Sequence, residues 1–169
     1  RLYGPLYRRI LSHASRIIVT SASYRETSPW LSGHAAKCRI VPLGIDPAPF
    51  RLKEPCMETP GRLLFVGRLR YYKGLDTLLQ AIVPLPEVSL TVAGDGPMRQ
   101  QWQSLTDRLA IGHRVSFLGD ISEDSLPDLY RKADLFVLPA NSRAEAFGTV
   151  LLEAMASGLP CITTEIGTG

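Results

Sequence analysis

The sequence predicts an α/β fold with a doubly wound, mostly parallel β-sheet. Between residues 61 and 169, five short apolar runs follow one another, and each has the length of a buried strand. Segments of helical character separate these runs. Strands that alternate with helices are joined by right-handed crossovers, which place the strands side by side in parallel. In such sheets, ligands bind beyond the carboxyl ends of the strands.

The residues before this sheet are predicted to form a smaller unit. Its four expected elements are a basic helix over 6–14, a β-branched strand over 16–20, a helix over 22–31, and a short strand that runs into a turn over 39–46. Ser21 has the residue type that caps a helix amino terminus. The proline-rich segment 47–60 has no regular period and marks a linker. We therefore predict one unit over 1–46, a linker, and a domain over 61–169.

The elements of the larger domain follow from its apolar runs and glycines. The first run, at 62–66, lies between Gly61 and Gly67 and is apolar after Arg62, as a strand buried on both faces is expected to be. The other expected strands cover 88–93, 115–118, 135–138 and 160–164, and the expected helices cover 75–82, 98–109, 126–132 and 148–157.

Composition narrows the possible functions. With 169 residues and 45% apolar composition, the chain can bury one sizeable core and part of a second. A net charge of +3 is too small to indicate nucleic-acid binding, whereas a phosphorylated small ligand or an anionic membrane surface is compatible with it. Cys38, Cys56 and Cys161 are far apart and form no metal-binding pattern, so we expect thiols in a reducing compartment.

The sequence has no apolar run approaching the roughly 20 residues that span a bilayer, and its start lacks the apolar core of a signal peptide. The expected location is the cytoplasm. The chain has no initiator methionine and stops just after an apolar strand, so we expect it to be part of a longer polypeptide.

Cations follow the first strand of the larger domain. Arg68 and Lys73 lie in the loop that starts at Gly67, where the sheet rule places a ligand. Arginine binds phosphate oxygens with two donors and lysine acts as a point charge, so a diphosphate is a suitable partner. The alternative is a solvated surface loop, in which exposed cations are common.

The loops after the second and third strands are less specific. Segment 94–97 reads Gly-Asp-Gly-Pro and serves mainly to form a tight turn, with a minor role in lining the ligand cleft as the alternative. It lacks the glycine pattern of a dinucleotide fold and of a P-loop, so a nicotinamide or ATP site has little support. Gly119 ends the third strand; its missing side chain lets a flat base approach the backbone, although an ordinary strand-to-loop glycine is an equal alternative.

Two carboxylates flank a predicted helix start after the fourth strand. Gly148 and Thr149 begin the helix, whose free N–H groups and dipole favour an anion. Glu145 precedes this turn and Glu153 lies more than one turn inside the helix, and a carboxylate accepts hydrogen bonds well from paired sugar hydroxyls. Alternatively, each acid is only a favourable or neutral surface charge. The combination of acids, helix start and cations at the strand ends of one sheet favours a ligand site.

These segments resemble glycosyltransferase family 4, the glycosyl transferases group 1, which are retaining enzymes with two facing Rossmann-like domains in the GT-B architecture. The most specific feature is a pair of glutamates separated by seven residues, Glu145 and Glu153. The matching segments are 41–46, 65–68 with 73–74, 92–97, 115–119, and 145–148 with 153–158. The resemblance implies that 61–169 is the carboxyl-terminal, donor-binding domain.

The resemblance implies a catalytic role for Arg68, Lys73 and Glu145. Arg68 and Lys73 would bind the diphosphate of a nucleotide sugar, and Glu145 would contact its sugar. The ribose of the donor would contact Glu153, and its base would contact the turn of Gly119, Asp120 and Ile121. The sugar and phosphate would contact the backbone of Phe147, Gly148 and Thr149. Gly67 would also belong to the donor site. No metal and no cofactor beyond the donor substrate is expected.

The resemblance also implies that residues 1–46 are the end of an amino-terminal, acceptor-side domain. That domain's glycine-rich loop and acceptor pocket would lie outside this sequence, as would the last strand and the crossing helix of the larger domain. We therefore expect this piece alone to bind donor weakly and to catalyse nothing.

For the intact enzyme, the resemblance implies hexosyl transfer with retention at the anomeric carbon. Segments 19–24 and 41–46 resemble bacterial mannosyl and rhamnosyl transferases of surface-polysaccharide assembly, which favours a GDP-mannose-like donor and a glycan or lipid-linked acceptor. The basic helix over 6–14 would then contact the inner membrane leaflet, or else pack on its own domain. The alternatives are a sucrose- or starch-synthase-like transferase, a sugar-phosphate synthase, and a non-catalytic nucleotide-sugar-binding module.

Overall fold

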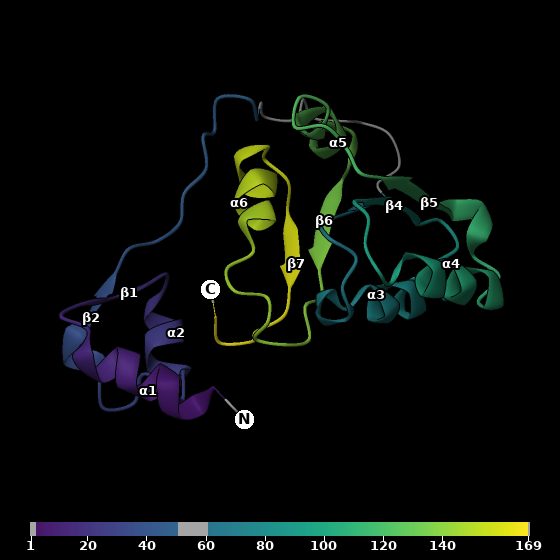
Figure 1. Cartoon of the computed structure of the whole chain (residues 1–169). Coiled ribbons are helices and arrows are strands. Elements are labelled where there is room, and N and C mark those ends of the chain that lie inside the picture. The colour runs from purple at the N-terminus through teal and green to yellow at the C-terminus, as the bar shows by residue number, and fades with distance from the viewer. Residues whose placement is uncertain (1–2, 51–60, 169) are drawn as a thin grey trace.

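The computed structural model describes residues 3–50 and 61–168 and has the predicted doubly wound parallel sheet (Figure 1). The strand order is β5-β4-β3-β6-β7, and all four pairings are parallel. The chain builds outward from β3 to β5, then returns to place β6 on the other side of β3. The switch in direction therefore lies between β3 and β6, where a doubly wound sheet opens a crevice for ligands. The strands are β3 (Arg62–Val66), β4 (Ser89–Ala93), β5 (Val115–Gly119), β6 (Leu135–Leu138) and β7 (Cys161–Thr163).

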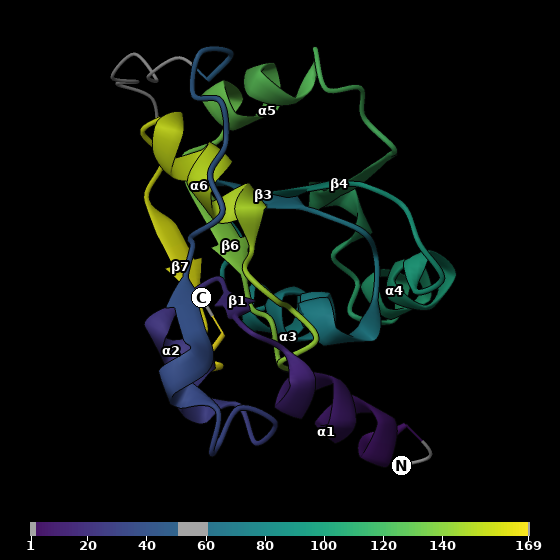
Figure 2. The ribbon, with the colours of Figure 1, turned by 60° about the vertical axis from the view of Figure 1, so that its left-hand side comes forward.

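Two pairs of helices cover the sheet, one pair on each face (Figures 1 and 2). On one face α3 packs beside α4, and on the other α5 packs beside α6. Buried apolar residues from the strands and both helix pairs form one continuous core, which includes Trp102, Phe65 and Phe136. The helices are α3 (Leu75–Ala81), α4 (Arg99–Arg108), α5 (Leu126–Lys132) and α6 (Thr149–Ala156), with short 3₁₀ turns η2 (Tyr71–Lys73) and η3 (Gly112–Arg114).

The amino-terminal residues form a second, smaller sheet of two parallel strands, β1 (Ile17–Val19) and β2 (Cys38–Ile40). Helices α1 (Gly4–His13) and α2 (Ala22–Thr27) and the turn η1 (Ala35–Lys37) complete this unit. Its core is small and consists of Leu11, Val19, Leu31 and Cys38. Figure 2 shows α2 beside the carboxyl-terminal end of the chain. Of the predicted linker 47–60, residues 51–60 lie outside the described part, and the domain boundaries stay a prediction.

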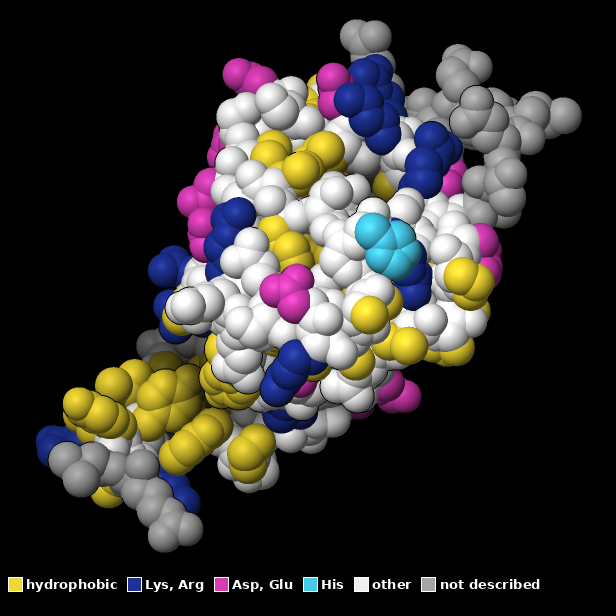
Figure 3. Space-filling view, turned by 90° about the vertical axis from the view of Figure 1, so that its right-hand side faces the viewer, with side chains coloured by type: hydrophobic (Ala, Val, Ile, Leu, Met, Phe, Trp, Pro, Cys, Tyr) yellow, Lys and Arg dark blue, Asp and Glu magenta, His cyan; other side chains and the backbone are white. Residues whose placement is uncertain are grey.

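Helix α1 exposes much of its apolar side. Leu6 and Ile10 are 57% and 56% exposed, and only Leu11 is buried. Figure 3 shows hydrophobic and basic side chains gathered on the lobe that carries the amino-terminal residues. The described helices include none that is long and apolar enough to cross a membrane.

The helix predicted over 22–31 is shorter than expected. Ser21 is confirmed as its cap, because Ser21 Oγ accepts a hydrogen bond of 2.9 Å from Tyr24 N. The helix ends at Thr27, and Ser28 is extended. Pro29 explains this end, because a proline disfavours helical backbone in the residue before it.

The segment 39–46, predicted as a short strand running into a turn, continues strand β2 only at its start. The strand ends at Ile40, and only Val41 N continues the pairing, with a bond to Val19 O. Pro42 has no N–H to donate to a neighbouring strand, so the ladder cannot continue in regular form. Elsewhere the predicted strands and helices differ from the observed ones by at most two residues at either end.

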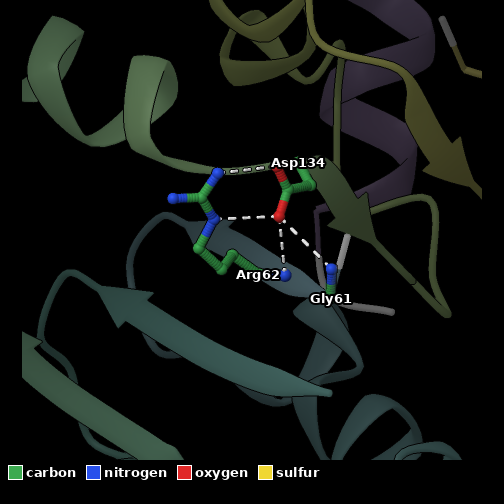
Figure 4. A network of polar contacts seen from close by, with 3 residues as sticks. All are labelled: Gly61, Arg62 and Asp134. Carbon is green, nitrogen blue, oxygen red and sulfur yellow. Dashed lines mark hydrogen bonds and ion pairs between the residues drawn. The ribbon is translucent and has the colours of Figure 1, made fainter. Parts of the chain in front are cut away.

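A polar network fixes the amino-terminal ends of β3 and β6 (Figure 4). Asp134 accepts bonds from the guanidinium of Arg62 at 2.9 and 3.0 Å, and from the backbone N–H groups of Arg62 and Gly61 at 3.0 and 3.2 Å. A two-pronged arginine–carboxylate contact defines geometry as well as energy. The network holds the two switch strands together at the end opposite to the candidate site.

Candidate active site

A buried ion pair joins the loops that follow the two switch strands. Lys73 Nζ, in η2 after β3, lies 2.6 Å from Glu145 Oε2, in the loop after β6, and the side chains are 9% and 12% exposed. Within the described residues, Oε2 accepts no hydrogen bond of regular geometry. The lysine charge is therefore the contact that compensates the burial of this carboxylate oxygen.

Glycine makes the approach of these two loops possible. Gly74 has a left-handed backbone with φ of 69°, and a Cβ at this position would lie 1.9 Å from Pro139 O. The loops are also joined by a 2.9 Å hydrogen bond from Asn141 N to Tyr72 O. The sequence pattern Lys73-Gly74 thus combines a charge with the residue that lets the charge reach Glu145.

Arg68 and Lys73 flank Gly67 but have different surroundings. A Cβ at Gly67 would lie 3.1 Å from Lys73 Nζ, so the lysine crosses directly over this glycine. Arg68 is exposed, and among the described residues it has no hydrogen-bond or ion-pair partner. One predicted cation is therefore already paired within the protein, whereas the other faces solvent.

A cavity of about 430 Å³ lies beyond the carboxyl ends of β3, β4 and β5. Four predicted residues line it: Gly67, Arg68, Asp120 and Ile121. Gly119 ends β5 with a left-handed φ of 79° and accepts a 2.7 Å hydrogen bond from Gly94 N, but it does not line the cavity.

The turn 94–97 contributes Gly94, Asp95 and Gly96 to this cavity. Val66, Ala93 and Leu126 complete its lining, and no motif marks Leu126. Asp95 forms a 2.9 Å ion pair with Arg99. The backbone N–H of Gly96, followed by Arg99, holds the pKa of Asp95 below its usual value. The Gly-Asp-Gly pattern predicts the turn and allows it to line the cleft, but it does not single out Asp95 as the side chain involved.

A second cavity of about 380 Å³ lies beyond β6 and β7, and Glu145, Phe147 and Gly148 line it. Gly148 has a left-handed φ of 74° and precedes α6, and no described side chain caps this helix. The first-turn N–H groups of α6 thus form an anion-favouring end next to the cavity. Thr149 begins the helix, is exposed and does not line the cavity.

Other walls of the second cavity come from Ser23 on α2 and from segment 163–168, which starts at the last residue of β7. No motif marks these residues, and only the folded chain brings them beside Glu145.

Glu153 lies apart from both cavities in this structure. It points from α6 towards α5, where Tyr130 Oη donates a 2.7 Å hydrogen bond to Glu153 Oε2. Tyr130 is completely buried, and burial together with the nearby carboxylate raises the pKa of its hydroxyl above the usual value. The carboxylate of Glu153 is thus held in one orientation by a buried neutral donor.

The described residues contain no group of three or more histidine, cysteine or acidic side chains arranged to hold a metal ion. Cys38 is buried and Cys161 is half-buried, with its pKa raised by burial, while Cys56 lies outside the described residues.

A cation, a buried ion pair and two cavities lie beyond the strand ends of a doubly wound α/β sheet, the place where such sheets bind ligands. The family model described as "Glycosyl transferases group 1" matches residues 50–169, and the chain belongs to this family. The expected GT-B fold is confirmed by solved glycosyltransferase structures.

Among relatives, D-rhamnosyltransferase WbpZ of Pseudomonas aeruginosa is 35% identical over 176 residues, covering 100% of this chain and 46% of that protein. O-antigen chain mannosyltransferase C of Escherichia coli is 31% identical, covering 100% of this chain and 47% of its own length. The structure of sucrose-phosphate synthase from Thermosynechococcus elongatus matches with a TM-score of 0.84 and 29% identity, over 98% of this chain and 44% of that one. The chain thus spans about half the length of these relatives.

Proposed function

We propose that this chain is the donor-binding half of a family 4 glycosyltransferase that transfers a hexose from a nucleotide-diphosphate sugar with retention. One observation carries the proposal. Lys73 Nζ lies over Gly67, which lines the first cavity, and contacts Glu145, which lines the second. The lysine charge therefore lies where the two cavities approach each other. A diphosphate at this point would place its base in one cavity and its sugar in the other.

The chemistry of transfer fits this arrangement. As the glycosidic bond breaks, negative charge grows on the leaving diphosphate, and cations fixed in advance lower the barrier. Lys73, Arg68 and the start of α6 would supply this stabilisation, with Glu145 orienting the sugar. For Glu153, which lies apart from both cavities, the ribose contact implied by the resemblance stays a prediction. Because Lys73, Arg68 and the start of α6 supply positive potential, we propose that the reaction needs no cofactor beyond the donor substrate.

The similarity to a rhamnosyltransferase and a mannosyltransferase supports a GDP-mannose-like donor and a glycan or lipid-linked acceptor in polysaccharide or lipopolysaccharide synthesis. A second candidate is sucrose- or starch-synthase-like transfer, which the likeness to sucrose-phosphate synthase favours. A non-catalytic binding module has less support, because such a module does not need a buried Lys73–Glu145 pair next to the sugar cavity.

We propose a cytoplasmic location with peripheral contact at the inner face of the plasma membrane. The exposed Leu6 and Ile10 and the neighbouring Arg8 and Arg9 on α1 support this contact, because apolar side chains flanked by cations favour an anionic lipid surface. Sedimentation of the protein with anionic but not neutral vesicles is the expected result, and equal recovery with both would contradict it.

A transfer assay distinguishes these functions. The complete enzyme is incubated with GDP-, UDP- and ADP-linked hexoses and candidate acceptors, and the anomeric configuration of the product is determined by NMR. We expect transfer from GDP-mannose to a glycan or lipid-linked acceptor, with the configuration of the donor kept. Transfer to fructose 6-phosphate or to an α-glucan chain would instead establish the second candidate, and an inverted product would refute retention.

A further inference from the structure

Arg143 joins the loop that carries Glu145 to helix α2 of the amino-terminal unit. Its guanidinium lies over the ring of Tyr24, with Cζ 5.5 Å from the ring centroid. Its Nη1 donates a 2.7 Å hydrogen bond to Thr27 Oγ1. The described residues place no carboxylate within ion-pair distance of this cation. An aromatic face and a hydroxyl, both on α2, are therefore its binding partners.

Helix α2 is also tied to the wall of the second cavity. Ser21 Oγ, the cap of α2, donates a 2.5 Å hydrogen bond to Thr168 O. Thr27 Oγ1 lies 2.7 Å from Gly167 O, at the other end of the helix. Ser23, between these two contacts, lines the cavity together with Glu145. Both ends of α2 are thus held against segment 163–168, and the middle faces the proposed sugar site.

The turn between Arg143 and Glu145 is short and internally bonded. Glu145 N donates to Ser142 O at 3.0 Å, and Ala144 N donates to Ser142 Oγ at 3.3 Å. On the other side, Asn141 N is held by Tyr72 O at 2.9 Å. The loop is therefore fixed at Asn141 by the β3 side of the site and at Arg143 by α2, with Glu145 two residues beyond.

From these contacts we propose that Arg143 is a positioning residue, which makes the orientation of Glu145 depend on the seating of α2. Arg143 does not itself line either cavity. The inference rests on the proposed function, because it assigns to α2 the task of holding the sugar-contacting carboxylate in its productive place. When α2 moves away, the loop loses one of its two anchors and Glu145 loses its fixed geometry.

The first test measures hydrogen exchange in the loop that carries Glu145 and does not depend on enzyme activity. Hydrogen exchange followed by mass spectrometry is compared for this chain and its Arg143→Met and Thr27→Val variants. The matched control is Arg25→Met, which alters a cation of α2 that pairs only with the adjacent Glu26 among the described residues. We expect faster exchange in peptides covering 141–147 for Arg143→Met, a smaller rise for Thr27→Val, and none for Arg25→Met. Unchanged exchange in Arg143→Met would overturn the inference, whatever the enzyme's activity.

The second test uses the complete enzyme. Arg143→Met is expected to lower kcat by about tenfold or more, because small misplacements of a reacting group are costly. The donor dissociation constant should change little, and Arg143→Lys, which keeps the charge over Tyr24, should recover part of kcat. In the double variant Arg143→Met/Thr27→Val, the loss in kcat should be smaller than the product of the losses in the two single variants. A loss confined to KM, or equal losses in Arg25→Met, would overturn the inference. A loosened loop in an enzyme that transfers no sugar would refute the proposed function and leave the positioning of the loop established.

Discussion

Replacing Glu145 by alanine in the complete enzyme is expected to lower kcat about a thousandfold, the upper range for loss of one group that stabilises a transition state. Glu145 lines the second cavity beside the start of α6, where the sugar of the donor is proposed to bind. Its carboxylate would act on the sugar as the bond to the diphosphate breaks. The donor dissociation constant is expected to change by less than about tenfold, because the base and diphosphate contacts remain.

Steady-state kinetics and calorimetry of donor binding separate these effects. Glu123→Ala is the matched control, because Glu123 is exposed, lines neither cavity and has no partner among the described residues. This control should keep near-normal kcat. Near-normal turnover in Glu145→Ala, or a loss that appears entirely in donor binding, would contradict the role assigned to Glu145.

Replacing Lys73 by methionine is expected to reduce both activity and stability. The variant loses a cation proposed to contact the leaving diphosphate, which should lower kcat/KM by about a hundredfold or more. It also leaves the carboxylate of Glu145 buried without its charge partner, and breaking a buried pair in this way costs about 3 kcal/mol of unfolding free energy.

Chemical denaturation of Lys73→Met and of the double variant Lys73→Met/Glu145→Gln isolates the second effect. The double variant has no unpaired charge, so it should regain much of the lost stability but none of the activity. Lys132→Met, which alters an exposed lysine at the end of α5, is the control and should leave both quantities unchanged. If Lys73→Met were as stable as this control, the ion pair would contribute nothing to the stability of the fold.

The sheet and most element boundaries could be predicted because each strand of the larger domain is a short apolar run ended by a glycine, a proline or a charged residue. The run at 62–66, for example, is enclosed by glycines and forms β3 as expected. The larger boundary error, at the end of α2, involves Pro29, which disfavours helical backbone in the residue before it.

The candidate site could be predicted only as a set of positions along the chain. The cations after β3 and the acids after β6 were assigned to one ligand face, but nothing in the spacing shows that Lys73 pairs with Glu145. That pairing depends on the 3₁₀ turn η2 and on the close approach of Gly74 to Pro139. The bond from Tyr130 to Glu153 and the contact of Arg143 with α2 likewise join residues far apart in sequence. Such pairs follow from packing and have no local signature.

We propose that a nucleotide diphosphate binds between the two cavities, at the Lys73–Glu145 pair. Titration calorimetry of this chain with GDP, UDP and ADP, and with their hexose derivatives, tests it most directly. We expect weak but measurable binding of one nucleoside diphosphate. Its association constant should fall about tenfold or more in Arg68→Ala and in Lys73→Met, because contacts between a cation and a phosphate are charge-assisted. Equal indifference to all three nucleotides, or binding unaffected by both substitutions, would contradict it.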